Sequence, residues 1–396
     1  MLNSFIQKLT LLALALGLGF LVDCAGPEGP AGVNGTNGSN GTAPCEACHS
    51  GTNADFNLKW NQYGLSLHGT GTIYAEEAGK PTTCGGCHNG DGFAEACALG
   101  QNDAVTAATE PINCKACHFI HNKYDSTDFN RRWTTAITFR QPASPTTTQD
   151  FNGSGNLCAK CHQLRPITRT QTTFNGVVCD TFARTSTTSR ITHHGMAANM
   201  ETGFGIPTFT GFDASKITAS SHINLPKGCV SCHMNTDLGI NNTGATKDVP
   251  NPASGGHTFK MVTASLANID SNYFKTTCSC HPASALAAKT KPISTAMASD
   301  ISKLWTKLIS LSLIDTTGEI VYSGGTTTTD VLAESLKLSK AGIVGFGTDT
   351  VHVMSSDTVN ALINYFLVRQ DRSNGAHNPA MMQAQVSALK TFFGVQ

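Results

Sequence analysis

Apolar residues recur at helical spacing in the last third of the chain, and this pattern predicts several helices there. One apolar face follows Pro292 and consists of Ile293, Met297, Ile301, Leu304 and Leu308. A second consists of Val359, Leu362, Ile363, Phe366 and Leu367. The same reasoning predicts a helix over 379–393, a shorter one over 331–340 that ends before Gly342, and a small strand or hairpin at 319–322. We therefore expect residues 286–396 to form a helical C-terminal subdomain.

The middle of the chain lacks this periodicity. Residues 44–285 contain linkers rich in Thr, Gly and Asn, with few regularly spaced apolar positions. Such a polypeptide cannot form a hydrophobic core by itself. The sequence therefore predicts short helical turns and loops that pack around something other than their own side chains.

The N-terminal segment is typical of an export signal. An apolar run over 9–22 follows Lys8, and it is shorter than the about 20 residues of a membrane-spanning helix. We therefore predict a signal peptide over 1–24 and an exported protein at the outer-membrane surface or outside the cell. The run ends at Cys24 in a sequence similar to a bacterial lipoprotein box, but Asp23 stands where a small residue is usual. A lipid anchor at Cys24 and simple cleavage near Ala25 are both open.

Glycine occupies every third position from Gly26 to Gly41. A collagen triple helix has this period, but six triplets with few prolines are too short to form one. Residues 25–43 are therefore predicted to be a flexible linker.

Composition excludes some partners and points to a cofactor. Lys and Arg together number 27, as do Asp and Glu, so the formal net charge is zero and no basic stripe is available for nucleic acid. Charged residues make up only 14% of the chain. The 15 cysteines and 14 histidines are too many for a reduced cytosolic enzyme of 396 residues unless they bind a metal or a cofactor.

Ten of the cysteines lie in five copies of the motif Cys-x-x-Cys-His. The motif residues are Cys45, Cys48 and His49; Cys84, Cys87 and His88; Cys114, Cys117 and His118; Cys158, Cys161 and His162; and Cys229, Cys232 and His233. Two thiols three positions apart can both form thioethers to the vinyl groups of a haem, and the following histidine then binds the iron. Zinc sites use similar cysteine pairs, but five copies that are all followed by histidine favour c-type haem. Covalently held porphyrins would also supply the apolar mass that residues 44–285 lack.

A sixth site is imperfect, because Cys278, Cys280 and His281 keep the Cys-His pair but set the first cysteine one residue closer. Two outcomes are open. Cys280 attaches a haem by one thioether with His281 as the iron ligand, while Cys278 is either bonded or free; or the site holds no haem. We favour the sixth haem.

Eight histidines remain outside these motifs, and six haems with two histidine ligands each would need six of them. The eight are His68, His121, His193, His194, His222, His257, His352 and His377. His377 precedes Asn378 and Pro379, which are predicted to be the N-cap and the first residue of a helix, so its imidazole would project from a helix start. The two adjacent histidines are expected to supply one ligand, and His352 is the weakest candidate.

These motifs, the lone-histidine spacings and the segment around His377 resemble the multihaem c-type cytochromes. The number of motifs and the length are similar to those of six-haem surface cytochromes of metal-reducing bacteria, some of which polymerise into conducting filaments. The resemblance implies a mainly α fold with abundant loop, in which residues 44–285 form a multihaem core and 286–396 donate a distal histidine. The segment 232–234 is also similar to multihaem enzymes that convert nitrite or hydroxylamine, but those keep one haem open or lysine-ligated, and no Cys-x-x-Cys-Lys occurs here.

Two imidazoles on every iron would leave no position for a substrate. The first hypothesis is therefore an electron carrier that passes electrons along its haems to an extracellular acceptor or a partner cytochrome, as a monomer or a filament. The alternative is a reductase of nitrite or hydroxylamine with one open haem. Cys97 and Cys179 lie outside all motifs, and a disulfide between them or two free thiols are both open.

Overall fold

The computed structural model describes most of the chain after residue 50. The described residues are 51, 53–76, 81–104, 106, 109–141, 147–166, 170–174, 176–183, 195–234, 255–260, 283–311, 313–314 and 351–396. Several predictions fall outside these ranges and stay predictions: the signal peptide, the glycine repeat, and the elements at 319–322 and 331–340. The same holds for the candidate ligands Cys45, Cys48, His49, His193, His194, Cys278, Cys280 and His281.

The chain is mainly helical, as predicted, and its first part is made of short turns of helix. These are α3 (Ala54–Gly64), α4 (Leu67–Thr70), α5 (Ile73–Glu76), η2 (Pro81–Gly85), α6 (Gly86–His88), α7 (Gly90–Ala98), α8 (Cys114–Cys117), η3 (Ser126–Phe129), α9 (Ser154–Cys161), α10 (Ala197–Thr202), η4 (Ala214–Lys216), η5 (Ser221–Asn224), α11 (Val230–His233) and η6 (Gly256–Thr258). Many begin at a side chain that accepts a backbone N–H, as Asn53, Ser66 and Asn89 do. Such caps stabilise helices too short to persist alone.

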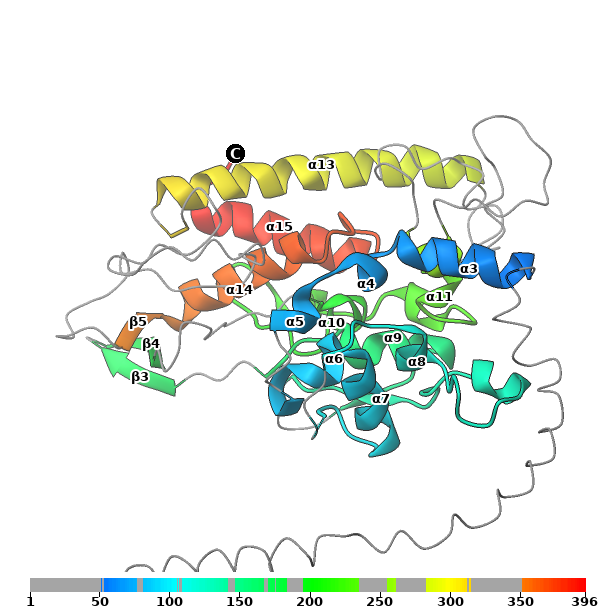
Figure 1. The fold of residues 1–396 in the computed structure, drawn as a ribbon. Helices are drawn as coiled ribbons and strands as arrows, with labels where there is room; N and C mark the ends of the chain where they lie inside the picture. The colour runs from blue at the N-terminus through cyan, green and yellow to red at the C-terminus, as the bar shows by residue number, and fades with distance from the viewer. Residues whose placement is uncertain are drawn as a thin grey trace, which may run out of the picture. The chain divides into compact units, whose positions relative to one another are not determined.

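Three longer helices, α13 (Ala283–Ser310), α14 (Ser356–Gln370) and α15 (Pro379–Phe393), form the C-terminal part, and α15 packs against both of the others (Figure 1). The bounds of α15 are those predicted, with Asn378 accepting a hydrogen bond from Met381 N at 3.3 Å as the N-cap. α13 begins at Ala283, before the apolar face that follows Pro292, and it continues through this proline.

Two small antiparallel sheets complete the secondary structure of the described ranges. β1 (Ile137–Thr138) pairs with β2 (Thr148–Gln149), and β4 (Val177–Ala183) lies between β3 (Thr170–Phe174) and β5 (Val351–Ser355). Gly176, with φ 82°, makes the turn between β3 and β4. The three-stranded sheet was not predicted, since β5 comes from a distant part of the chain.

The largest apolar cluster crosses the predicted boundary at residue 285. Residues from all three long helices, such as Leu304, Phe366 and Leu389, pack in it with Met196 and Met200 from the region of α10. Two smaller clusters lie beneath the motif helices α8 and α9. The described residues from Gly51 on thus belong to one packed unit, in which α14 and α15 pack with the region of α10.

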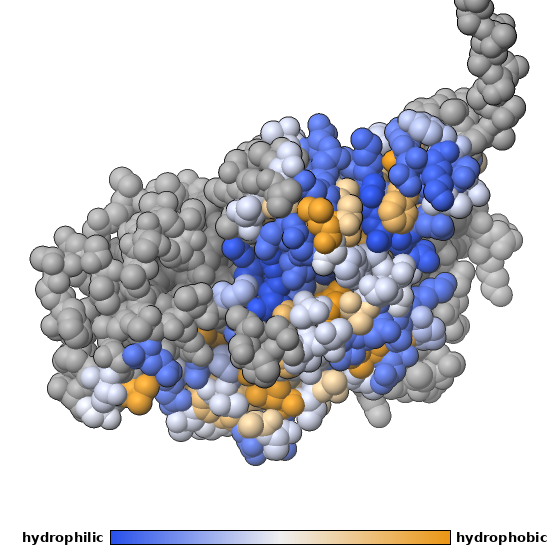
Figure 2. Space-filling model, turned by 90° about the horizontal axis from the view of Figure 1, so that it is seen from below, coloured by the Kyte–Doolittle hydropathy of each residue, from blue (hydrophilic) through white to orange (hydrophobic). Residues whose placement is uncertain are grey.

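The surface mixes apolar and polar residues on the face seen in Figure 2. Large apolar side chains are exposed on the first two helices, where Trp60 is 57%, Leu65 49% and Leu67 76% accessible. Within the described ranges, no helix combines the length and the apolar character that crossing a bilayer requires.

Candidate functional site

Each of the four described Cys-x-x-Cys-His motifs folds into one turn of helix: at the junction of η2 and α6, in α8, at the end of α9, and in α11. Three of them repeat the same backbone hydrogen bond, from the histidine N–H to the carbonyl of the first cysteine. This bond joins His118 to Cys114, His162 to Cys158 and His233 to Cys229, each at 2.9 Å. A helical turn brings positions i and i+3 to one face, so both thiols of a motif can reach the same group.

Three motif histidines face a histidine from a distant part of the chain. The ring centres lie 6.1 Å apart for His68 and His162, 6.4 Å for His118 and His257, and 6.1 Å for His233 and His377. When two opposed imidazoles bind one metal ion with bonds of about 2 Å, their ring centres lie about 6 Å apart. All three pairs therefore have the spacing that a single ion between two imidazoles needs.

In three of these six rings, the Nδ1 nitrogen already has a hydrogen-bond partner. His118 Nδ1 lies 2.6 Å from Phe129 O, and His233 Nδ1 lies 3.1 Å from Phe259 O. His377 Nδ1 lies 2.6 Å from a carboxylate oxygen of Asp371. In a neutral imidazole, donation from Nδ1–H fixes the ring and leaves Nε2 as the free lone pair, which is the usual arrangement of a metal-binding histidine.

Burial keeps most of the paired imidazoles neutral. It is the largest cause that lowers the pKa of His68, His118 and His233. Burial and the neighbouring His118 lower the pKa of His257 to about 4. A neutral imidazole is the form that binds a metal, so these rings are ready for one at neutral pH.

His377 differs from the others. Burial by itself lowers its pKa, but the charge of Asp371, the hydrogen bond to Asp371 and the charge of Glu201 outweigh burial and raise the pKa to about 9. The His233–His377 pair thus lies in a negative electrostatic environment.

Thiols from different motifs are in contact. Cys87 and Cys161 are hydrogen-bonded, which lowers the pKa of Cys87 to about 7 and raises that of Cys161. Cys158 and Cys229 form a second such pair, with the pKa of Cys158 lowered and that of Cys229 raised. The motif at 158–162 therefore lies between the motifs at 84–88 and 229–233.

Two glycines allow this close approach. A Cβ on Gly155 would lie 3.1 Å from Gly228 Cα and 3.2 Å from Cys229 N, and a Cβ on Gly228 would overlap Phe151 O. Gly228 also has a φ of 51°, which favours glycine. Larger residues here would push the 229–233 motif away from α9.

The disulfide between Cys97 and Cys179, one of the two outcomes left open by the sequence, is not formed. Cys97 is a free thiol that packs with Cys117 and Cys161 in the cluster around Phe93, whereas Cys179 belongs to β4. Burial raises the pKa of Cys97 to about 11. Of the two options open from the sequence, the free thiol is the one observed for Cys97.

The remaining described candidate histidines differ in their burial and in their contacts. His88 ends α6 and is half-buried. His222 Nδ1 lies 3.0 Å from Ala376 O, the same type of Nδ1 contact that the paired histidines make. His121 is exposed in a loop with φ 63°, and its ring centre lies 5.7 Å from that of Tyr124. His352 lies in β5 opposite Phe182, and the position of its side chain is not described.

Sequence reasoning missed the residues that orient the paired histidines. Asp371 follows α14 and belongs to no motif, and the carbonyl groups of Phe129 and Phe259 have no side-chain signature. Only the folded chain brings these acceptors to the histidines.

Within the described ranges, no cluster of three or more His, Cys, Asp or Glu side chains could hold a metal ion. Each histidine pair supplies two ligands, which is the number a haem iron takes from a protein when both axial positions are filled. No family model, curated protein or solved structure matches the chain. The function is therefore inferred from the residues themselves.

Proposed function

We propose that this chain is an exported multihaem c-type cytochrome, in which about six haems with two histidine ligands each carry electrons to an extracellular acceptor or a partner cytochrome. One observation supports this above all others. Three motif histidines each oppose a lone histidine, with ring centres 6.1–6.4 Å apart. Disulfides need no histidine, and a zinc site of two cysteines and two histidines would bring all four side chains into one cluster, whereas the described ranges contain no cluster of three or more such ligands.

The residues of each site have separate tasks. The two cysteines of a motif would hold the porphyrin by thioether bonds, and the motif histidine and the lone histidine would both supply imidazole ligands to the iron. The Nδ1 acceptors Phe129 O, Phe259 O and Asp371 keep the rings oriented. When bound, the haem supplies one-electron iron chemistry.

Two buried hydrogen-bond donors near the motifs also fit the presence of haem. Asn89 Nδ2 and Trp133 Nε1 are buried and have no hydrogen-bond partner in the described structure. Asn89 directly follows His88, and Trp133 packs against the clusters beneath α8 and α9. Unpaired buried donors are costly, and the propionates of a haem offer acceptors for them.

Exposed apolar side chains support the same proposal. Trp60, Leu65 and Leu67 precede His68 and are about half or more accessible. We expect them to cover porphyrin edges, which would remove their apolar surface from water.

The contacts between motifs favour passage of electrons. Cys161 touches Cys87, and Cys158 touches Cys229, so groups attached to these three motifs would be neighbours. Because both axial positions would be occupied by imidazole, the iron would exchange electrons without binding a substrate.

Intact mass measured under denaturing conditions tests the cofactor. Thioether bonds survive denaturation, so the account predicts the mass of the processed chain plus six haems, or plus five if the imperfect site is empty. A double substitution, Cys229→Ser with Cys232→Ser, should remove one haem of this total. A purified protein with the bare polypeptide mass, or with zinc in place of haem, would overturn the proposal.

Addition of carbon monoxide to the reduced protein distinguishes the carrier from the reductase. Irons with two histidine ligands have no open position, so the visible spectrum should not change. Formation of one carbon monoxide complex per chain would favour the nitrite or hydroxylamine reductase instead.

A further inference from the structure

The Nδ1 partner of His377 is different in kind from the partners of the other paired rings. His118 and His233 contact neutral backbone carbonyl groups, at 2.6 and 3.1 Å. His377 contacts the carboxylate of Asp371 at 2.6 Å. Among the Nδ1 contacts described for the three pairs, this is the one made to an ionisable side chain.

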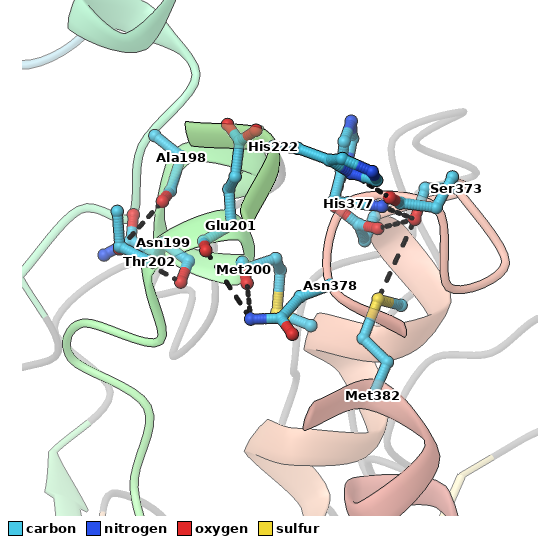
Figure 3. A network of polar contacts seen from close by, with 12 residues as sticks. Ala198, Asn199, Met200, Glu201, Thr202, His222, Ser373, His377, Asn378 and Met382 are labelled. Carbon is cyan, nitrogen blue, oxygen red and sulfur yellow. Dashed lines mark hydrogen bonds and ion pairs between the residues drawn. The ribbon is translucent and has the colours of Figure 1, made fainter. Parts of the chain in front are cut away.

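The carboxylate is held rigidly in this position. Asp371 is 8% exposed, and its second oxygen accepts a hydrogen bond from Ser373 Oγ. Ser373 Oγ also accepts from the backbone N–H of His377, at 3.3 Å. Asp371, Ser373 and His377 therefore form a closed ring of hydrogen bonds, as Figure 3 shows for Ser373 and His377.

A second carboxylate adds to the negative charge. Glu201 is 8% exposed, and Figure 3 shows its side chain beside the histidines of this region. Its charge acts on His377 in the same direction as that of Asp371.

The other two pairs have different surroundings. Lys59 and Arg131 act on His118, and Lys59 and Asp55 act in opposite directions on His257, so this pair has more positive than negative neighbours. For His68 burial is the dominant influence. The two carboxylates that act on His377 thus distinguish it from His68, His118 and His257.

We propose that Asp371 is a positioning residue that lowers the reduction potential of the iron site between His233 and His377. This inference rests on the proposed function, since it assigns a property to one haem. A carboxylate on Nδ1–H makes the imidazole a stronger donor, and nearby negative charge favours ferric over ferrous iron. Both effects lower the reduction potential of this site.

Spectroelectrochemical titration of the holoprotein tests the proposal. Asp371→Asn keeps the shape of the side chain but removes its charge, and it should make reduction of one haem at least tenfold more favourable, an upward shift of about 59 mV for a one-electron couple. His377→Met should move the same spectral component, which identifies it. Asp371→Glu should keep the component close to its original potential.

The matched control is Asp300→Asn, which removes a carboxylate that pairs with Lys390 at 2.8 Å on the helices α13 and α15. Its potentials should equal those of the unmodified protein. An Asp371→Asn protein with full haem content and unchanged potentials would overturn the inference while leaving the proposed function intact. A protein without covalent haem would overturn the proposed function instead.

Discussion

Asn378 links the helix α15 to the segment that carries His377, so its replacement tests how the distal histidine is held. Its side-chain oxygen accepts from Met381 N at 3.3 Å, and its Nδ2 donates to Thr218 O at 2.7 Å and to Met200 O at 3.1 Å. The residue is 2% exposed. Figure 3 shows the amide pointing toward the carbonyl of Met200.

Asn378→Ala should lower the free energy of unfolding for two reasons. Loss of the N-cap lowers the free energy of unfolding by about 1 kcal/mol. Leaving the buried carbonyls of Met200 and Thr218 without their donor adds about 1–3 kcal/mol. We therefore expect a total loss of about 2–4 kcal/mol.

Urea unfolding followed by far-ultraviolet circular dichroism, at matched haem content, measures this loss. Asn378→Ser restores a capping oxygen but not the two donations from Nδ2, so it should recover about 1 kcal/mol. Asn360→Ala is the control, because the exposed amide of Asn360 donates to Thr208 O on the surface, and its effect should stay below about 1 kcal/mol. If Asn378→Ala unfolds at the same urea concentration as the unmodified protein, the segment around His377 is not held as described.

Three further predictions concern other parts of the site. His257→Met should raise the reduction potential of one haem and change its spectrum alone, because methionine–histidine ligation raises the potential; an unchanged spectrum would refute the pairing of His257 with His118. Gly228→Ala should destabilise the protein by about 2–4 kcal/mol in thermal unfolding, since its Cβ would overlap Phe151 O from a left-handed backbone; a neutral effect would contradict the close approach. Iodoacetamide should modify Cys97 more than about a hundredfold more slowly in the native than in the unfolded protein, because burial raises its pKa to about 11, and equal rates by peptide mapping would contradict its burial.

The sequence predicted the parts of the fold that depend on local pattern. The apolar stripe and the Asn-Pro start determine α15, and the stripes at 293–308 and 359–367 identify α13 and α14. The apolar face of α13 begins only after Pro292, but the helix starts earlier and holds this proline in its interior rather than in its first turn, where a proline is usual. The pairing of β5 with β4 was missed because it joins distant segments, whereas the hairpin of β3 and β4 is local and was also not predicted.

The same limit applies to the site. The motif residues and the number of available histidines are visible in the sequence, but which lone histidine faces which motif depends on the folded chain. His68 pairs with the motif at 158–162 although two other described motifs lie between them in sequence. Asp371 carries no motif at all, and its role comes from the hydrogen bonds that fix it beside His377.

The central claim is that paired imidazoles occupy both axial positions of the irons. Electron paramagnetic resonance of the fully oxidised protein tests this most directly, with the spin count compared against the haem content of the same sample. The account predicts low-spin ferric iron that accounts for all of the haem. A high-spin ferric signal that amounts to one iron or more per chain would contradict it.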